Sequence, residues 1–314
     1  MLLAAALLVA GAAIVYVGAE LAVRGAMWIS RAAGISAFAI GALLFGIDPE
    51  GLGTAAVAAG RGETALGAGG IFGSVLFLFS AAFGVAVVVA RRPVPAPSPI
   101  MMAAPAAGVA AAALAIADRY VSRPEALLLL LLYAAYVTLV LLERRWPAGE
   151  RPPEPPAGEE ERAHERIRVL PAAVAAGVGL ALLVGGALLL VDGGARVAAR
   201  TGLSAGFVGA ALVGVLTSLD EVLLEVLPIR RGAPELATGN LFGTLAAFTT
   251  GVPGIAALIR PLSLDGGTQL AFLALAFVYA LVAGTFFVRG RVGWVLGLVV
   301  LSFYAVWLVV AATF

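Results

Sequence analysis

Long apolar stretches, each about the length of a membrane-crossing helix, alternate with short polar turns along most of the chain. Because about 20 apolar residues cross the hydrocarbon core as an α-helix, this pattern predicts ten transmembrane helices. Their expected ranges are 3–29, 35–60, 65–90, 99–117, 124–143, 169–198, 203–229, 234–259, 268–288 and 292–312. Several boundaries coincide with clusters of Arg, Pro or Gly, which commonly end helices. The pattern therefore predicts an all-α integral membrane protein.

Composition supports this interpretation and excludes several chemistries. Of the 314 residues 62% are hydrophobic and only 12% are charged, whereas soluble domains carry about 25% charged residues. The chain has no Cys, which excludes disulfides, thiolate metal sites and Cys nucleophiles. Its single histidine, His164, lies in a charged segment, which argues against a His-based metal site. The first apolar run lacks a preceding basic region and is expected to be a helix, not a cleaved signal.

The only long polar segment, 144–168, is rich in Arg, Glu and Pro. We interpret it as a solvated linker, with a regulatory or ion-sensing loop as the alternative. Placing this segment in the cytoplasm also places most arginines there, in agreement with the positive-inside rule. The expected protein is multi-pass in the plasma membrane, with both termini outside.

An internal repeat divides the chain at this linker. The matching stretches are Gly34-Ile35-Ser36 with Gly202-Leu203-Ser204, Phe72-Gly73-Ser74 with Phe242-Gly243-Thr244, and Glu50 with Glu221. Five expected helices precede the linker and five follow it, so the two copies have opposite orientations. We expect inverted five-helix repeats at 1–143 (core 34–90) and 169–314 (core 202–259). Inverted repeats with a midplane site between them are a transporter architecture.

Acidic side chains interrupt the apolar stretch in both copies. Glu50 lies in the first copy and Glu221 in the second, each near the middle of its expected helix. A carboxylate at this depth is costly unless an ion, a proton or a water-filled cavity compensates it. We therefore predict that the two glutamates face each other and form one cation site. The alternative is that each is a structural glutamate satisfied by a proton or an arginine.

Other polar residues near these glutamates are further candidate ligands, because Ca²⁺ takes 6–8 oxygens. The neutral candidates are Asn240, Thr217, Ser218, Thr244 and Ser74, and the acidic ones are Asp48, Asp220 and Glu225. Asn240 could instead form an interhelical hydrogen bond, and the hydroxyls could bond back within their own helices. Asp48 points about 200° away from Glu50 on a regular helix, so both face one ion only if Pro49 distorts the turn.

Glu225 has two open interpretations. It follows Glu221 by four residues, one turn along the same helix face. It could hold a second ion or accept a proton on the access path. Alternatively, it could pair with Arg230 or Arg231 near the helix end.

The motif order resembles the α-repeat of the sodium/calcium exchanger family. This order is Gly, Ile or Leu, Ser, then Thr-Ser-Leu-x-Glu, then Gly-Asn-x-x-Gly followed by Ser or Thr. In the second copy, Gly202 to Glu221 and Glu221 to Asn240 both span 19 residues. The resemblance implies two inverted five-helix halves. It also implies ions bound between the second, third, seventh and eighth helices, with one central glutamate from each repeat.

The sequence departs from that family pattern at the expected site. The first copy lacks the Thr-Ser pair before Glu50, Asp220 replaces the family's proline, and Gly70 stands at the family's Asn or Asp position. The site has therefore lost neutral oxygen ligands and gained carboxylates.

We expect a secondary antiporter that exchanges Ca²⁺ for Na⁺ by alternating access. The alternatives are a proton-coupled Ca²⁺/H⁺ or Na⁺/H⁺ antiporter and a degenerate family member that does not transport. A membrane hydrolase using Asp48 and Asp220 is disfavoured, because neither lies in a protease-like motif. The expected partners are the transported cations and the bilayer. We expect no enzyme activity, cofactor or nucleic acid, and a monomer.

Overall fold

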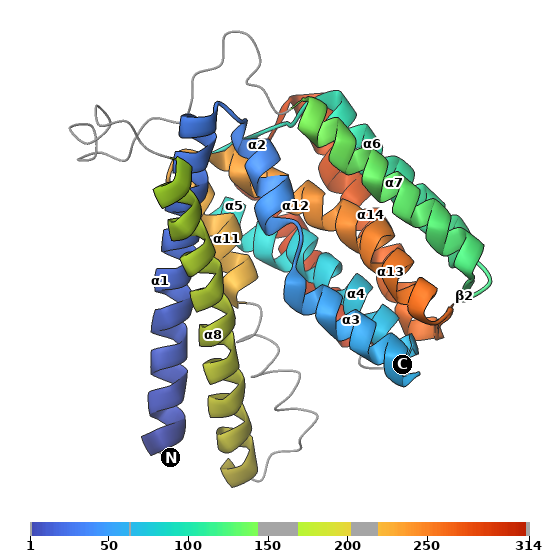
Figure 1. Ribbon diagram of the computed structural model, residues 1–314, viewed down its shortest axis with the longest axis horizontal. Coiled ribbons are helices and arrows are strands. Elements are labelled where there is room, and N and C mark those ends of the chain that lie inside the picture. Colours follow the sequence, from blue (N-terminus) through green and yellow to red (C-terminus); the bar gives the residue numbers. More distant parts are fainter. Residues whose placement is uncertain (1, 63, 144–168, 202–218, 312–314) are drawn as a thin grey trace.

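The computed structural model of the protein describes residues 2–62, 64–143, 169–201 and 219–311, and it is mostly helical (Figure 1). The α-helices are α1 (Leu2–Ala33), α2 (Ala37–Ile40), α3 (Pro49–Arg61), α4 (Thr64–Phe77), α5 (Phe83–Ala90), α6 (Pro99–Ala115), α7 (Arg123–Leu142), α8 (Val169–Thr201), α11 (Leu219–Arg230), α12 (Pro234–Ala246), α13 (Val252–Ile259), α14 (Gly266–Arg289) and α15 (Trp294–Ala311). Three π-helical segments join some of them: η1 (Gly41–Phe45), η2 (Leu78–Ala82) and η5 (Ala247–Gly251).

Within the described residues, six helices are long and apolar enough to cross a membrane: α1, the run Gly67–Ala90, α7, α8, the run Pro234–Ile259 and α14. Two shorter apolar helices are α6 and α15. The protein is therefore a multi-pass membrane protein. Most of the expected seventh helix, 203–229, precedes α11 and lies outside the described residues, so the count of ten helices stays a prediction.

Two short strand pairs modify the all-α expectation. The strand β1 (Val94–Pro95) pairs antiparallel with β4 (Arg291–Val292), and β2 (Tyr120–Val121) pairs with β3 (Leu262–Ser263). Each strand has only two residues, and they join loops at helix ends. Such short pairings have no period-2 hydrophobic pattern, which is why the sequence did not predict them.

The helices α1 and α8 form an antiparallel pair on one side of the molecule (Figure 1). Gly11, Gly18 and Gly25 recur every seven residues on α1, and Gly179, Gly186 and Gly193 do so on α8. A Cβ added at Gly179 would lie 2.4 Å from the Ala22 backbone nitrogen, so the two backbones are in direct contact. Small residues at such seams allow membrane helices to approach closely.

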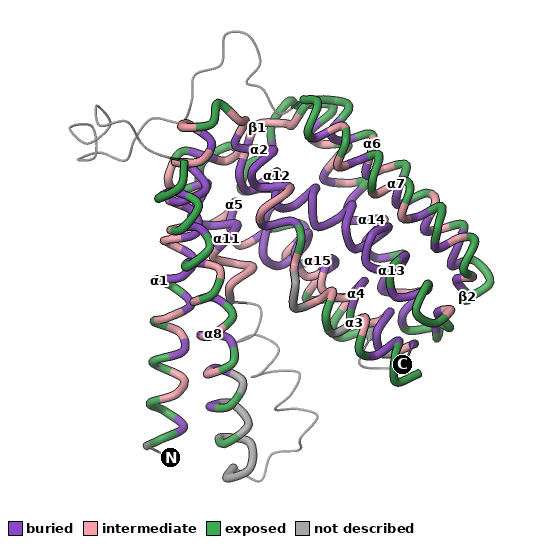
Figure 2. Tube along the Cα trace, in the orientation of Figure 1, coloured by how far each residue is buried: buried purple, intermediate pink, exposed green. Residues whose placement is uncertain are grey.

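The runs from α4 to α5 and from α12 to α13 form the centre of the remaining bundle. In their most apolar windows, 72% and 83% of the residues are buried, against 22% for α7 and 33% for α1 and α8. Figure 2 shows the same contrast between the central runs and the outer helices. Edge-to-face contacts join the centre to α14, for example Phe72 with Phe272 and Phe242 with Tyr279. These packed rings provide a rigid frame on which the site is built.

The expected continuous helix at 35–60 is interrupted. It begins after Ser36, the N-cap, whose side chain accepts a hydrogen bond from the Ala39 N–H, the usual role of serine at a helix start. It breaks at 46–48 and restarts as α3, with Pro49 at its first position. Proline has no N–H to donate and favours the first turn. Asp48 then caps α3, because its Oδ2 accepts a hydrogen bond of 2.9 Å from the Gly51 N–H.

The broken helix lies directly against α12 through glycines. A Cβ added at Gly41 would lie 2.2 Å from the Leu236 carbonyl oxygen, and one at Gly239 would lie 2.1 Å from the Phe38 carbonyl oxygen. Only glycine permits this approach without displacing backbone. The crossing brings the break at 46–48 beside the polar residues of α12.

Asp265 caps α14 and gives a prediction outside the apolar helices. Its Oδ1 accepts a hydrogen bond of 2.7 Å from the Thr268 N–H, which holds the pKa of the carboxyl below its ordinary 3.8. Because the folded-state pKa is lowered, this stabilisation is complete above the ordinary pKa and is lost as the pH falls through the lowered value. We expect Asp265→Ala to cost about 1 kcal/mol of stability near neutral pH.

Thermal unfolding of the purified protein between pH 7 and pH 3 measures this effect. Asp265→Ser is the matched variant, because it keeps a cap acceptor without a titratable group. It should retain most of the stability and lose only the pH-dependent part, which solvent screening keeps small at this exposed position. Equal melting temperatures for the Ala variant and the wild type would contradict the capping role.

Candidate cation site

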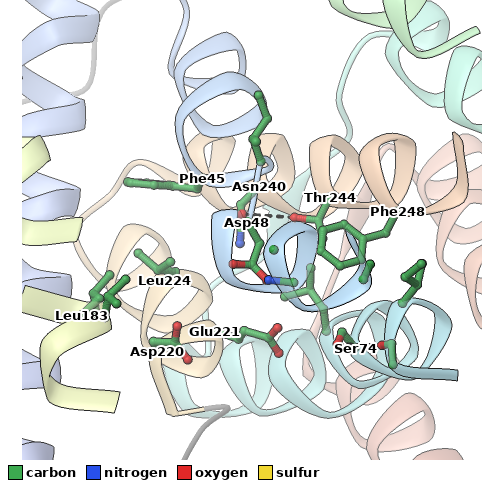
Figure 3. Close-up of a pocket in the computed structure, with 18 of the residues that line it drawn as sticks. Phe45, Asp48, Ser74, Leu183, Asp220, Glu221, Leu224, Asn240, Thr244 and Phe248 are labelled. Atoms are coloured by element: carbon green, nitrogen blue, oxygen red, sulfur yellow. Dashed lines mark hydrogen bonds between the residues drawn. The ribbon is translucent and has the colours of Figure 1, made fainter. Parts of the chain in front are cut away.

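A pocket of about 710 Å³ lies where α3, α4, α8, α11 and α12 meet (Figure 3). Most of its wall is apolar. Six of the predicted site residues line it: Asp48, Ser74, Asp220, Glu221, Asn240 and Thr244. They come from both halves of the chain. The structure therefore gathers around one pocket residues that lie up to 196 positions apart in the sequence.

Three carboxylates of the pocket come from α3 and α11. Asp48 lies at the cap of α3, while Asp220 and Glu221 lie in the first turn described for α11. Figure 3 shows Glu221 extending into the pocket, with Asp220 on the side of Leu183 and α8. The two neighbours therefore face different parts of the wall, as expected for residues about 100° apart on a helix.

Asn240 and Thr244 supply neutral polar atoms one turn apart on α12. Both are buried, and the Thr244 hydroxyl lies 3.4 Å from Asn240 Oδ1, to which it donates (Figure 3). The Asn240 Nδ2 donates to Glu225 Oε1 at 2.9 Å. This is the interhelical hydrogen bond that the sequence left as the alternative. It uses the nitrogen of the amide, so the oxygen remains on the side of Thr244.

Ser74 lines the opposite wall from α4, and its hydroxyl donates to the Gly70 carbonyl at 2.9 Å. The hydroxyl therefore bonds back within its own helix, one of the two expected outcomes. The hydroxyl oxygen keeps a lone pair that can accept a hydrogen bond or coordinate a cation.

Several central predictions fall outside what the structure describes. Thr217 and Ser218 lie outside the described residues, and so does the side chain of Glu50. The backbone of Glu50 lies in the first turn of α3, between Asp48 and Gly51, which both line the pocket. The predicted meeting of Glu50 with Glu221 therefore stays a prediction.

Glu225 does not form the ion pair that the sequence left as one possibility. It is completely buried and contacts Asn240. The side chain of Arg231 donates to Glu20 of α1, which also pairs with Arg24 at 2.8 Å. Arg230 is exposed. Because Glu225 points toward α12 and not along α11, a pairing inferred from sequence proximity alone is wrong here.

The carboxylates that the structure describes lie at different parts of the pocket wall. Among the residues that the structure describes, no three His, Cys, Asp or Glu side chains are close enough to hold a metal ion together. A cation bound by Asp48 or Glu221 would need neutral oxygens or water to complete its shell. Asn240, Thr244 and Ser74 are the neutral groups in position to contribute.

Comparison with known proteins establishes the family. A model of the family described as sodium/calcium exchanger protein matches residues 3–142 and 171–313. The chain belongs to the sodium/calcium exchanger family. The two matched stretches correspond to the two repeats of this exchanger-family protein, and they confirm the resemblance inferred from the motifs.

Two curated proteins are similar over part of this exchanger-family chain. A putative antiporter, CaxA, of Alkalimonas amylolytica is 30% identical over 48% of this chain and 46% of its own. An uncharacterized membrane protein, MJ0091, of Methanocaldococcus jannaschii is 29% identical over 42% of this chain and 43% of its own. The chain thus spans less than half the length of the curated relatives it matches.

Solved structures match the fold along nearly the whole length. Structures of the sodium-calcium exchanger NCX_Mj, soaked with Na⁺ alone or with Na⁺ and Sr²⁺, align with a TM-score of 0.81 and cover 97% of both chains. At 20% and 21% sequence identity, this likeness concerns the fold alone.

Sequence reasoning missed two features of the site. The first is the α8 wall, formed by Leu180, Leu183 and Val184, because apolar residues on an apolar helix carry no distinguishing signal. The second is the partner of Asn240 in its interhelical hydrogen bond, which is Glu225, 15 residues away on a different helix. The sequence carries only a weak signal for this contact, namely one polar residue in each of two neighbouring apolar segments.

Proposed function

We propose that this protein is a secondary antiporter that exchanges Ca²⁺ for Na⁺ by alternating access. The observation that carries the proposal is the pocket between the two repeats, where Asp48 and Glu221 accompany the amide of Asn240 and the hydroxyl of Thr244. Hard cations prefer such carboxylate and neutral oxygens. Carboxylates within membrane segments commonly mark ion pathways. Membership in the exchanger family supports the same function.

The proposed ligands divide into central and peripheral groups. Glu221 and Glu50 supply the central charge, one from each inverted repeat. Asn240, Thr244, Ser74, Thr217 and Ser218 supply neutral oxygens. Asp48 and Asp220 contribute charge at the two sides of the pocket. The full protein would then have ten helices in two inverted halves, with both termini outside the plasma membrane.

The α1 and α8 pair is the proposed moving element. Leu180, Leu183 and Val184 place an apolar wall of α8 against the pocket, while the remaining lining comes from other segments, among them α3, α4, α11 and α12. Sliding of the pair along this wall would expose the pocket to one side of the membrane and then to the other. A smooth apolar surface favours sliding because it has few directional bonds to break.

Proton coupling is the second candidate, and the carboxylates favour it. Asp48, Asp220 and Glu221 line one pocket, and Asp220 replaces a proline of the family motif. A site in which three carboxylates accompany three neutral polar side chains can exchange a cation for protons without changing its ligand set. Ca²⁺/H⁺ or Na⁺/H⁺ exchange would then replace Na⁺/Ca²⁺ exchange.

Uptake of ⁴⁵Ca²⁺ into proteoliposomes distinguishes these functions. With Na⁺ inside and none outside, we expect uptake well above that of protein-free liposomes, and collapse of the uptake when Na⁺ is equal on both sides. Uptake driven by a pH gradient and indifferent to Na⁺ would establish the proton-coupled alternative. Absence of uptake under both gradients would show that the protein does not transport Ca²⁺.

A further inference from the structure

Glu225 lies behind the pocket, where, among the residues that the structure describes, it forms one hydrogen bond, with Asn240. It is completely buried on α11, one turn beyond Glu221, and it does not line the pocket. Its Oε1 accepts from the Asn240 Nδ2 at 2.9 Å. Its Oε2 is buried without a hydrogen-bond partner among the described residues. Asn240, in contrast, does line the pocket.

The orientation of the Asn240 amide determines whether its oxygen or its NH₂ group faces the pocket. One end of the amide is an oxygen that accepts, and the other is an NH₂ group that only donates. The oxygen can coordinate a cation, whereas the NH₂ group repels one. Because Glu225 takes the NH₂ group, the oxygen stays beside the Thr244 hydroxyl, which donates to it. Glu225 and Thr244 together hold the Asn240 amide in this orientation.

We infer that Glu225 is a positioning residue, whose Oε1 holds the Asn240 amide with its oxygen toward the cation pocket. This inference rests on the proposed function. Outer groups that orient metal ligands act in the same way elsewhere, and their loss typically lowers metal affinity by about 10- to 100-fold.

The surroundings of Glu225 support this role over a purely structural one. Its neighbours Leu224, Val226 and Leu227 are buried and apolar. Of the two arginines that follow on the chain, Arg230 is exposed and Arg231 pairs with Glu20. A buried carboxyl with an unpartnered oxygen costs free energy, and an apolar side chain of similar volume would fill the space without that cost. Orientation of the Asn240 amide therefore explains a glutamate at position 225 better than a purely structural role does.

Ca²⁺ titrations of the whole 314-residue chain test the inference, with the shift in melting temperature as the readout of affinity. The variants are Glu225→Leu, Asn240→Leu and the double variant. We expect Glu225→Leu to weaken Ca²⁺ affinity by about 10- to 100-fold while the ion-free melting temperature stays the same or rises. In the Asn240→Leu background, we expect Glu225→Leu to cause no further loss, because the amide it orients is gone.

Two further variants complete the design. Glu225→Gln keeps an oxygen acceptor for the Asn240 NH₂ group and should bind Ca²⁺ within about 10-fold of the wild type, on the same scale. Thr249→Val is the control, because Thr249 is buried in η5, donates its hydroxyl to the Leu245 carbonyl and does not line the pocket. It should leave Ca²⁺ affinity unchanged.

The outcomes separate this inference from the function on which it rests. Equal losses from Glu225→Leu with and without Asn240 would overturn the positioning role, because Glu225 would then act on the ion directly. A Gln variant as weak as the Leu variant would also overturn it. A wild-type protein that responds to neither Ca²⁺ nor Na⁺ would instead overturn the proposed function, and the positioning role with it.

Discussion

Replacing Glu221 by Gln is expected to reduce Na⁺-driven ⁴⁵Ca²⁺ uptake by at least about 100-fold, because loss of a proposed direct ligand should exceed the loss caused by outer groups. The substitution keeps the size of the side chain and removes its negative charge. Glu221 extends into the pocket from the first described turn of α11 (Figure 3). In low-dielectric surroundings, the loss of one negative charge strongly weakens the binding of a divalent cation.

Asp192→Asn is the matched control for this prediction. It also removes one acidic charge from a helix, but Asp192 lies on α8, away from the pocket lining, and its half-exposed side chain pairs with Arg196 at 3.0 Å. Its uptake should stay within about twofold of the wild type, since exposed ion pairs contribute little. Uptake that survives Glu221→Gln at the wild-type rate would remove Glu221 from the site.

Replacing Gly179 by Ala is expected to separate α1 from α8 and to lower stability and transport together. The added Cβ would lie 2.4 Å from the Ala22 nitrogen and 2.7 Å from the Gly18 carbonyl oxygen. Both are backbone atoms and cannot rotate away. Forced overpacking of this kind typically costs about 1–3 kcal/mol, and displacement of the α8 wall should reduce uptake as well.

Gly177→Ala on the same helix provides the control, because nothing lies within 4 Å of a Cβ added there. Alanine favours helix more than glycine does, so this variant should be as stable as the wild type or slightly more stable. Melting temperatures of the two variants in detergent, together with their uptake, make the comparison. If both variants melt at the same temperature, the close contact between α1 and α8 is not the source of stability.

The sequence alone was enough to predict the membrane class, most helix positions and the family. Helices in a bilayer need long apolar runs, and the Glu221 and Asn240 spacing in the second repeat carries the family motif. Local rules likewise account for the cap that Ser36 provides and for the pairing of Glu20 with Arg24, four residues apart. Each of these inferences depends on neighbours in the sequence, which helix geometry brings together without tertiary packing.

Tertiary structure decided the relations between segments that are distant in the sequence. The break at 46–48 could be suspected from Pro49, but its place beside α12 depends on Gly239 meeting the backbone at Phe38. Glu225 had two possible roles along its own helix, and the packing of α11 on α12 gave it Asn240 in place of an arginine. A helix repeats its side-chain directions every 3.6 residues, so the sequence specifies which face a residue occupies. Which helix covers that face depends on how closely two backbones can approach, and glycine contacts between distant segments set that distance here.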